Sequence, residues 1–388
     1  MASPPGRQLV ASVAAVVVVA ATVGALVGGF PDLHVYRYAG QSVLDQWPAY
    51  RYDDPVTGYP LTYPPFAALL MVPVALLPGW AAAGLWTGLS AGCLAAVVVL
   101  VRREQGRPVP WAWVPAASLA ALALEPVWQN YAFGQVNAIL MLLVLVDVLR
   151  PERRWSGVLV GIAAGVKLAP LVFVVLLLVV GQRAAAARAA AAFAATVVVG
   201  LVAFPGAASY WTDGLLDPGR VGPPALAHNQ SVSGALTRVL GAPPPAVLWL
   251  AVAVPLTAGV LLVARAWWRR GDRVIAACLG ALAMLLASPV SWSHHWVWAM
   301  PMALALWQRS RVAALLWTAV FVARPMLWLP WAEGRELDWR WWEHVPGNAY
   351  VLASLGIVAW LAVTARAGAP SSRGRRSSSS CSRRARRR

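Results

Sequence analysis

Long apolar runs recur along the whole chain, and they decide what it can fold into. The first extends from Leu9 to Val27, and similar runs lie at 80–101, 134–150, 184–204, 246–264 and 347–363. About 20 apolar residues suffice to cross the hydrocarbon core of a bilayer. Because 60% of the 388 residues are hydrophobic and only 12% are charged, the composition excludes an ordinary soluble enzyme and predicts an all-α polytopic membrane protein. We interpret the first run as a retained span rather than a cleaved signal, since it lacks a convincing small-residue cleavage site.

The arginines predict the topology. Clusters of basic residues mark cytoplasmic loops, and the arginines of this chain gather between the apolar runs and in a Ser/Arg tail. Placing every cluster inside gives about 11–12 transmembrane passes with both termini cytoplasmic. The loops 31–79 and 205–245 then face the outside of a plasma membrane. We expect one transmembrane domain over 1–366 and a disordered basic tail over 367–388.

Charge and cysteine content limit the classes of partner and cofactor that we expect. A net charge of +17 distributed in this way is typical of positive-inside topology and of contact with anionic lipid, so we expect membrane lipid and no nucleic acid as a partner. The three cysteines, Cys93, Cys278 and Cys381, have neither a disulfide framework nor metal-ligand spacing. We therefore expect no metal and no redox cofactor. The oligomeric state is open.

The stretch from Ser156 to Val180 does not fit as a single span, because arginine flanks both of its ends. Lys167 lies near its middle, and Pro170 follows soon after; proline disfavours helical geometry in the residue before it. Two half-length helices that meet at Lys167 and return to the same side resolve both problems, since broken helices are tolerated where they line a protein cavity.

Two further patterns concern packing and the membrane interface. Gly157, Gly161 and Gly165 place small residues on one helix face and indicate close packing. The segment from Pro64 to Leu77 is apolar but short and predicts an interfacial or re-entrant helix on the external side. The 22 tryptophans concentrate near predicted span ends, as an interfacial belt requires. Those around Trp292 could instead stack on a sugar ring.

Asp32 and Lys167 are the strongest candidates for chemistry. Asp32 lies just beyond the first apolar run, where it is either a helix N-cap or a general base in a cleft open to lipid and water. Lys167 is the single lysine of the chain, and a lone cation at an intramembrane break indicates a functional site. A phosphate group is its favoured partner, and an ion pair with Asp32, Glu125 or another acid is the alternative.

Other polar residues fall on the same predicted external face. His294 and His295 open a span and are candidates for phosphate or sugar contacts, whereas a histidine pair alone is weak evidence for metal. His228 and Asn229 offer hydrogen-bonding groups suited to sugars. Arg324 lies in the outer half of an apolar run and is expected to snorkel or to bind phosphate.

These residues lie in segments that resemble glycosyltransferase family 87, the polyprenol-phosphate-mannose-dependent alpha-(1,2)-mannosyltransferases of actinobacterial envelope synthesis. The resemblance covers about residues 30 to 325. Its motifs stand in order and are separated by membrane spans: Asp32-Leu33-His34-Val35-Tyr36, Tyr59-Pro60-Leu61-Thr62-Tyr63-Pro64-Pro65-Phe66, Gly134-Gln135-Val136-Asn137, Gly165-Val166-Lys167-Leu168-Ala169-Pro170, His228-Asn229-Gln230-Ser231 and Ser288-Pro289 through His294-His295.

The resemblance implies a GT-C glycosyltransferase with its active site on the extracytoplasmic face. It implies a polyprenyl-monophosphate sugar donor as co-substrate, a glycolipid or polysaccharide acceptor, and inversion at the anomeric carbon. Asp32 matches the family's general base in the first external loop. Lys167, with His294, His295 or Arg324, would stabilise the leaving phosphate. The substrate contacts that we expect from the motifs are His34, Tyr36, Tyr63, Gln135, Asn137, His228 and Asn229.

Two alternatives are carried forward. Related family members use decaprenyl-phospho-arabinose, and no residue of this chain separates an arabinofuranosyltransferase from a mannosyltransferase. A lipid or solute transporter would also contain broken helices and an intramembrane lysine. A transporter is expected to show internal repeat symmetry, and the sequence has no convincing duplication.

Overall fold

The computed structural model describes residues 29–110, 113–204, 206–214 and 218–367. Within these residues every regular element is a helix, and only two isolated bridges occur. The predicted all-α class is confirmed. The predicted span from Leu9 to Val27 and the basic tail beyond Ala367 lie outside the described residues.

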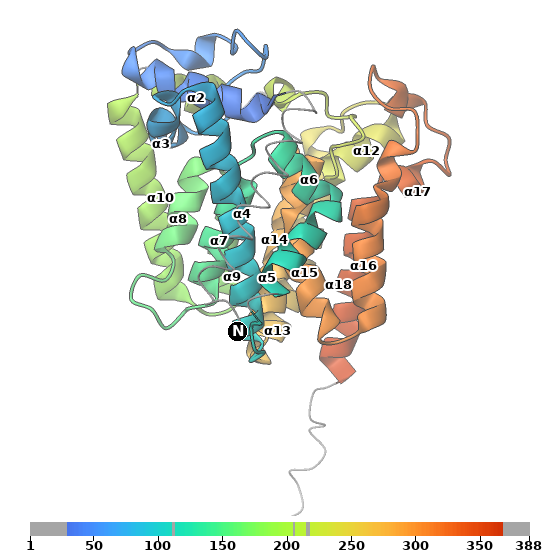
Figure 1. Cartoon of the computed structure of the whole chain (residues 1–388). Coiled ribbons are helices and arrows are strands. Elements are labelled where there is room, and N and C mark those ends of the chain that lie inside the picture. The colour runs from blue at the N-terminus through green and yellow to red at the C-terminus, as the bar shows by residue number, and fades with distance from the viewer. Residues whose placement is uncertain (1–28, 111–112, 205, 215–217, 368–388) are drawn as a thin grey trace, which may run out of the picture.

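The helices fall into an upper group and a lower bundle (Figure 1). The upper group comprises α2 (Pro31–Leu44), α3 (Pro65–Ala75), α6 (Glu125–Ala132), α11 (Ala207–Ser209), α12 (Val232–Leu240) and α17 (His344–Gly347). The lower bundle comprises α4 (Gly79–Glu104), α5 (Trp113–Ala120), α7 (Asn137–Val148), α8 (Val158–Val166), α9 (Val172–Val179), α10 (Arg183–Ala203), α13 (Ala246–Arg269), α14 (Arg273–Ala287), α15 (Ala299–Trp307), α16 (Arg311–Ala323) and α18 (Ala349–Ala367).

Within the described part of the chain, four helices are long and apolar enough to cross a membrane, namely α4, α10, α13 and α18. Helices α6 and α7 pass the same test as a pair bent by 119°, which would make a fifth span. Several shorter apolar helices, such as α3 and α14, accompany them. The estimate of about 11–12 passes also counted the residues before 29 and half-length helices, so the number of passes stays a prediction.

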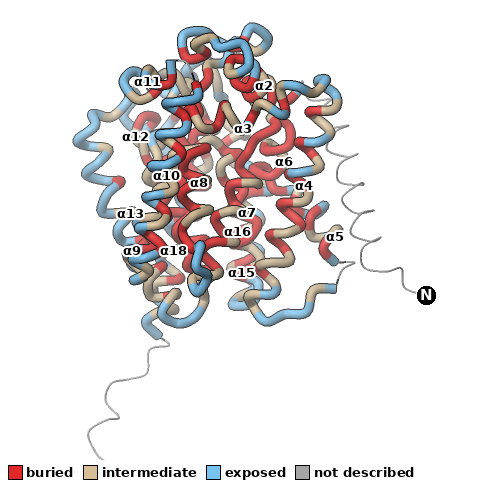
Figure 2. The backbone as a smooth tube through the Cα atoms, turned by 90° about the vertical axis from the view of Figure 1, so that its left-hand side faces the viewer, coloured by how far each residue is buried: buried red, intermediate tan, exposed pale blue. Residues whose placement is uncertain are grey.

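Exposed apolar side chains cover the outside of the bundle. In the most apolar 18-residue stretch of each helix, 17% of the residues of α13 and 28% of those of α10 are buried. In α4 the buried share is 56%. Figure 2 shows buried residues around α7 and α8 and exposed residues along α13 and α10. Val202 and Val247 are each about four-fifths exposed. Such surfaces are stable against hydrocarbon, in keeping with a multi-pass membrane protein.

Three ion pairs involve arginines at the lower end of the molecule. They link residues at the ends of α4, α7, α14 and α16, which adjoin the loops predicted to be cytoplasmic. The pairs are Arg150 with Glu104 at 2.6 Å, Arg273 with Glu152 at 3.6 Å, and Arg309 with Asp272. The upper group, with α2 and α3, lies at the opposite end (Figure 1).

The helix break predicted at Lys167 is present. Helix α8 ends at Val166, and Lys167 has extended backbone angles, φ −149° and ψ 129°. The short helix η3 (Ala169–Leu171) then leads into α9. Because α8 and α10 run parallel, with Gly157 beside Ala185 and Gly165 beside Thr196, the chain between them must return to the end from which α8 started.

The glycine row of α8 packs against α10, as the sequence indicated. At Gly161, a Cβ atom would lie 2.7 Å from Cβ of Ala192 and 2.9 Å from the backbone nitrogen of Phe193. Real Cβ atoms do not approach so closely, so only glycine allows this separation. The glycine row fixes the position of α8 along α10, and therefore the position of Lys167 at the end of α8.

Gly161→Ala is expected to lower the stability of the detergent-solubilised protein by about 1–3 kcal/mol, because the added methyl group overpacks the α8–α10 contact. Gly259→Ala in α13 is the matched control, since nothing lies within 4 Å of its Cβ position. There the same change is expected to be neutral or stabilising by up to about 1 kcal/mol. Thermal unfolding followed by size-exclusion recovery measures both, and equal shifts would contradict the packing argument.

Candidate active site

The N-terminus of α2 is bonded to the turn that follows α6. The backbone N–H groups of Asp32 and Leu33 donate to the carbonyl of Phe133, at 3.0 and 3.3 Å. The first N–H groups of a helix have no partner within the helix, so this carbonyl fixes where α2 begins. Asp32, which is half-buried, is thereby held next to the Gly134-Gln135-Val136-Asn137 motif.

Gly134 permits this close approach. Its φ is +69°, and a Cβ atom there would lie 2.8 Å from Cβ of Leu33. A positive φ and the lack of a side chain both favour glycine at this position. The sharp turn sends Gln135 and Asn137 into the interior, where both are buried.

Gln135 is the centre of a buried hydrogen-bond network. Its Oε1 accepts from the Tyr63 hydroxyl at 3.1 Å and from the Tyr36 hydroxyl at 3.3 Å, and these two hydroxyls lie 2.8 Å apart. Nδ2 of Asn137 donates to the same oxygen at 3.3 Å. Buried polar groups that are bonded in this way form a rigid arrangement. Four predicted substrate-contact residues thus come together from α2, α7 and the segments before α3 and α7.

Lys167 joins this network from the helix break. Its Nζ donates to Oδ1 of Asn137 at 3.0 Å and lies 2.8 Å from Nε2 of His295. An ammonium group has no acceptor, so Nε2 of His295 accepts this bond. Nζ also lies 5.5 Å from the ring centre of Tyr63. The half-buried lysine therefore points into the polar cluster and not toward lipid.

Asp32 and Lys167 are close enough to influence each other. Burial raises the pKa of Asp32 to about 6, and the bond to Gln135 and the attraction of Lys167 offset part of that rise. A carboxylate with a pKa near the working pH is suited to accept a proton. We call the cluster of Asp32, Tyr36, Tyr63, Gln135, Asn137, Lys167 and His295 the polar site.

His294 borders the polar site. Its ring contacts Phe133 and His295 edge to face, at centroid distances of 5.4 and 4.7 Å. Its backbone carbonyl accepts from Asn137 at 3.1 Å. Among the described residues its buried Nε2 has no hydrogen-bond partner, so that nitrogen is free for a ligand.

Comparison with known proteins identifies the family of this arrangement. Residues 61–289 match glycosyltransferase family 87. The chain belongs to glycosyltransferase family 87. This confirms the resemblance seen in the motifs, and the protein is a membrane glycosyltransferase.

Three relatives cover most of the chain. A polyprenol-phosphate-mannose-dependent alpha-(1-2)-phosphatidylinositol pentamannoside mannosyltransferase of Mycobacterium tuberculosis is 34% identical over 94% of this chain and 90% of its own length. The corresponding phosphatidylinositol mannoside mannosyltransferases of M. tuberculosis and Mycolicibacterium smegmatis are 34% and 31% identical. They cover 86% and 84% of this chain, and 85% and 82% of their own lengths. No solved structure matches the chain.

Two of the glycosyltransferase's predicted substrate contacts, Asn229 and His34, lie outside the bonds of the polar site. Asn229 is fully buried, its Nδ2 donates to the carbonyl of Pro224 at 2.9 Å, and its Oδ1 accepts from the backbone N–H of Ser291 at 3.0 Å. It supports the loop in which it lies. His34, on α2, is half-buried and follows Asp32 by two residues. Neither side chain is among the bonds of the polar site, so their contacts with substrate stay predictions.

Arg324 lies at the end of α16, exposed and with a positive φ of 44°. Its charge acts on the buried carboxylate of Glu125, which accepts from the Tyr350 hydroxyl at 2.9 Å. Arg324 is thus within electrostatic range of a second buried acid, and no hydrogen bond joins it to the polar site among the described residues. Glu125, one of the acids considered as a partner of Lys167, is bonded to Tyr350 instead.

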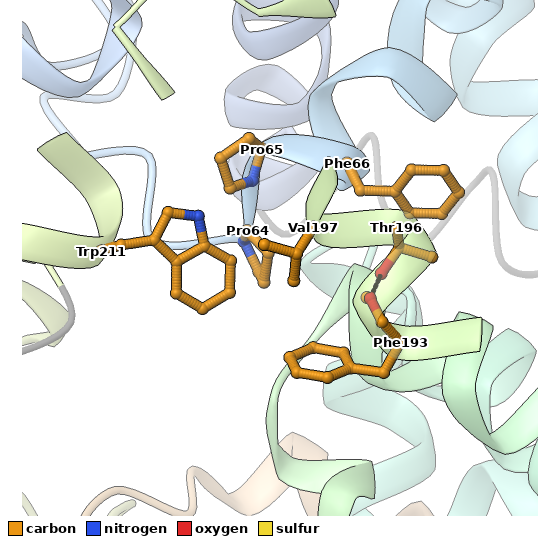
Figure 3. A pocket seen from close by; sticks show the side chains of 8 residues that line it. Pro64, Pro65, Phe66, Phe193, Thr196, Val197 and Trp211 are labelled. Atoms are coloured by element: carbon orange, nitrogen blue, oxygen red, sulfur yellow. Dashed lines mark hydrogen bonds between the residues drawn. The ribbon is translucent and has the colours of Figure 1, made fainter. Parts of the chain in front are cut away.

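An apolar pocket adjoins the polar site. Pro64 and Pro65 at the start of α3, Phe193 in α10 and Trp211 in η4 (Tyr210–Gly214) line it (Figure 3). Pro64 directly follows Tyr63, and the lining residue Gly165 precedes Lys167 by two positions. The sequence alone does not indicate this pocket, since Phe193 and Trp211 are ordinary apolar residues whose convergence depends on packing.

Among the described residues, no group of three or more His, Cys, Asp or Glu side chains is arranged to hold a metal ion. The histidine pair faces Lys167 and Phe133 instead. Independence from metal remains a prediction.

Proposed function

We propose that this family 87 glycosyltransferase transfers a mannosyl residue from polyprenyl-monophosphate mannose to a phosphatidylinositol mannoside at the extracytoplasmic face of the membrane. One observation carries the proposal: a carboxylate with a raised pKa lies within range of the charge of the chain's single lysine, and that lysine is held in a buried hydrogen-bonded cluster. A sugar transfer from a lipid phosphate needs a base on one side of the anomeric carbon and a positive charge on the other.

The relatives supply the substrate classes. Their names specify polyprenol phosphate mannose as donor and phosphatidylinositol mannosides as acceptors. The pentamannoside and the mannoside enzymes of M. tuberculosis are both 34% identical to this chain, so identity does not choose between acceptor lengths. Our proposal therefore includes both lengths.

The proposed reaction is a single displacement with inversion. Asp32 accepts the proton of the acceptor hydroxyl while that oxygen forms its bond to the anomeric carbon. The bond from this carbon to the phosphate oxygen breaks, and the electron pair leaves with polyprenyl monophosphate. Lys167 and the histidine pair stabilise the charge that develops on the phosphate, which is the term that usually contributes most. A phosphate leaving group requires no general acid.

The apolar pocket supports a lipid-linked donor. It adjoins the polar site through Tyr63–Pro64 and Gly165, and its walls in α3 and α10 continue into apolar surface exposed on the outside of the bundle. The first isoprene units of the donor would lie along this apolar surface while the phosphate reaches Lys167. A nucleotide-sugar donor would need polar protein groups where these apolar residues lie.

The positions of the arginine clusters support the proposed orientation of the site. They gather at the end of the molecule opposite α2 and α3 (Figure 1). Under the positive-inside rule we expect that end to face the cytoplasm, and the polar site would then lie toward the outside.

The test is a transfer assay with purified protein in lipid, a phosphatidylinositol mannoside and radiolabelled donor. Transfer from polyprenyl-phospho-mannose, with none from decaprenyl-phospho-arabinose, is the expected result. Transfer of arabinose alone would replace the sugar in the proposal. Movement of either lipid across vesicles without any transfer would favour the transporter alternative and contradict the proposal.

A further inference from the structure

His228 and Trp331 form a pair at the upper end of the molecule. Their rings meet edge to face at a centroid distance of 4.9 Å and an angle of 78°. His228 precedes α12, and Trp331 lies between the short helices η7 (Pro325–Leu327) and η8 (Arg335–Asp338). The indole of Trp331 is 38% exposed, so one part of it is free to contact a ligand.

A buried carboxylate holds the pair together. Oε1 of Glu336, which is 1% exposed, accepts from the backbone N–H of Ala227 at 3.0 Å and from that of Ala332 at 2.9 Å. These two residues are the immediate neighbours of His228 and Trp331. One carboxylate oxygen therefore fixes both loops, and the pair is preorganised.

Arg238 fixes the His228 loop from the other side. Its guanidinium, 1% exposed, donates to the carbonyls of Ala225, Leu226 and Asn229 at 3.0–3.2 Å and to Oδ1 of Asn348 at 2.6 Å. A buried cation is stable only when its donors are satisfied in this way. The loop is therefore held by a network of buried, satisfied hydrogen-bond donors.

The pair is connected to the polar site through the histidines. His228 lies close enough to His294 to act on its charge, and the His294 ring lies 4.7 Å from that of His295. His295 in turn bonds Lys167 at 2.8 Å. The pair thus lies within electrostatic range of the histidines that border Lys167.

The apolar pocket and the pair are formed by different parts of the fold. The pocket belongs to α3, α8 and α10, whereas His228 and Trp331 adjoin α12 and the segment before α17 (Figure 1). In an inverting displacement, the attacking hydroxyl and the leaving phosphate must approach the anomeric carbon from opposite directions. If the donor chain lies along the apolar surface of α3 and α10, the acceptor has to enter from the side of α12.

We infer that His228 and Trp331 form a subsite for a pyranose ring of the acceptor glycan, with the indole against the apolar face of the ring and the imidazole bonded to its hydroxyls. The inference rests on the proposed function and extends it to acceptor recognition. Burial lowers the pKa of His228, so the imidazole is neutral at pH 7 and offers one donor and one acceptor. That combination matches sugar hydroxyls.

The test compares two apolar replacements that differ in shape. Trp331→Leu removes the flat ring and is expected to raise the KM for a phosphatidylinositol mannoside acceptor about tenfold. Trp331→Phe keeps a flat ring and is expected to restore most of that loss. The KM for polyprenyl-phospho-mannose is expected to stay unchanged in both, because the donor does not touch the subsite.

Trp341 is the matched control. It belongs to the same upper loop and is 83% exposed, so it tests whether tryptophans here act as interfacial anchors. Trp341→Leu is expected to leave the acceptor KM unchanged. An unchanged acceptor KM in Trp331→Leu, or equal increases in the Trp331 and Trp341 variants, would overturn the subsite while leaving the proposed function intact. Absence of transfer by the unaltered protein would overturn both.

Discussion

Asp32→Asn is expected to reduce kcat for mannosyl transfer by about 10²–10⁴-fold, the usual contribution of a positioned general base. The amide has the size of the carboxylate and still offers an oxygen to Gln135, so the polar site keeps its geometry. What is lost is the ability to take the proton of the acceptor hydroxyl. We expect the KM for the donor to change little, because Asp32 stabilises the transition state and not the bound donor.

The pH profile sharpens this expectation. Burial raises the pKa of Asp32 to about 6, and the base acts only as the carboxylate. As the pH falls through about 6, the carboxylate fraction decreases, and kcat/KM is expected to fall about tenfold per pH unit below it. The residual activity of Asp32→Asn should lack this acid limb.

Asp45 offers the matched control for the base. It ends the same helix, is exposed, and bonds only Gln41 of α2 through its side chain among the described contacts. Asp45→Asn makes the same chemical change without touching the polar site, and wild-type kcat is expected. Mannosyl transfer at the wild-type rate by Asp32→Asn would remove Asp32 from the mechanism and return it to the role of a helix-terminal acid.

The sequence allowed the helix break and the convergence of the polar site to be predicted because both depend on rare residues. A single lysine inside an apolar stretch flanked by arginines has few physical solutions, and the return of the chain at Lys167 is one of them. The glycine row is equally informative, since glycines that recur every four residues on one helix face allow a second helix to approach closely. On these grounds the sequence predicted that Asp32, Lys167 and His295 lie on the same face of the molecule.

Contacts between common residues could not be predicted in this way. Asn229 has the same amide as Asn137, yet it supports a loop while Asn137 bonds Lys167. Trp331 is one of 22 tryptophans, and only the bonds of Glu336 to Ala332 beside it and to the distant Ala227 distinguish it. Arg324 comes within electrostatic range of Glu125 because α16 ends at Ala323, directly before Arg324. Each outcome depends on which loops meet, and local sequence does not contain that information.

Lys167→Gln is expected to reduce kcat/KM for the donor by about 10- to 100-fold, because a hydrogen bond to a charged group contributes about 1.5–3 kcal/mol. Glutamine retains a donor for Oδ1 of Asn137 but removes the positive charge opposite the phosphate. Arg183→Gln is the control, since it removes a cation from the far end of α10, next to the predicted cytoplasmic loop.

Two readouts separate phosphate recognition by Lys167 from a structural role. Polyprenyl phosphate, the lipid product, is expected to inhibit the unaltered enzyme more strongly than Lys167→Gln, whereas uncharged polyprenol should inhibit both equally. In addition, the attraction of Lys167 lowers the pKa of Asp32, so removing the charge should move the acid limb of the pH profile to higher pH. Equal inhibition of both proteins by polyprenyl phosphate, together with an unmoved acid limb, would mean that Lys167 only holds Asn137 and His295 in place, and the phosphate would then need another cation.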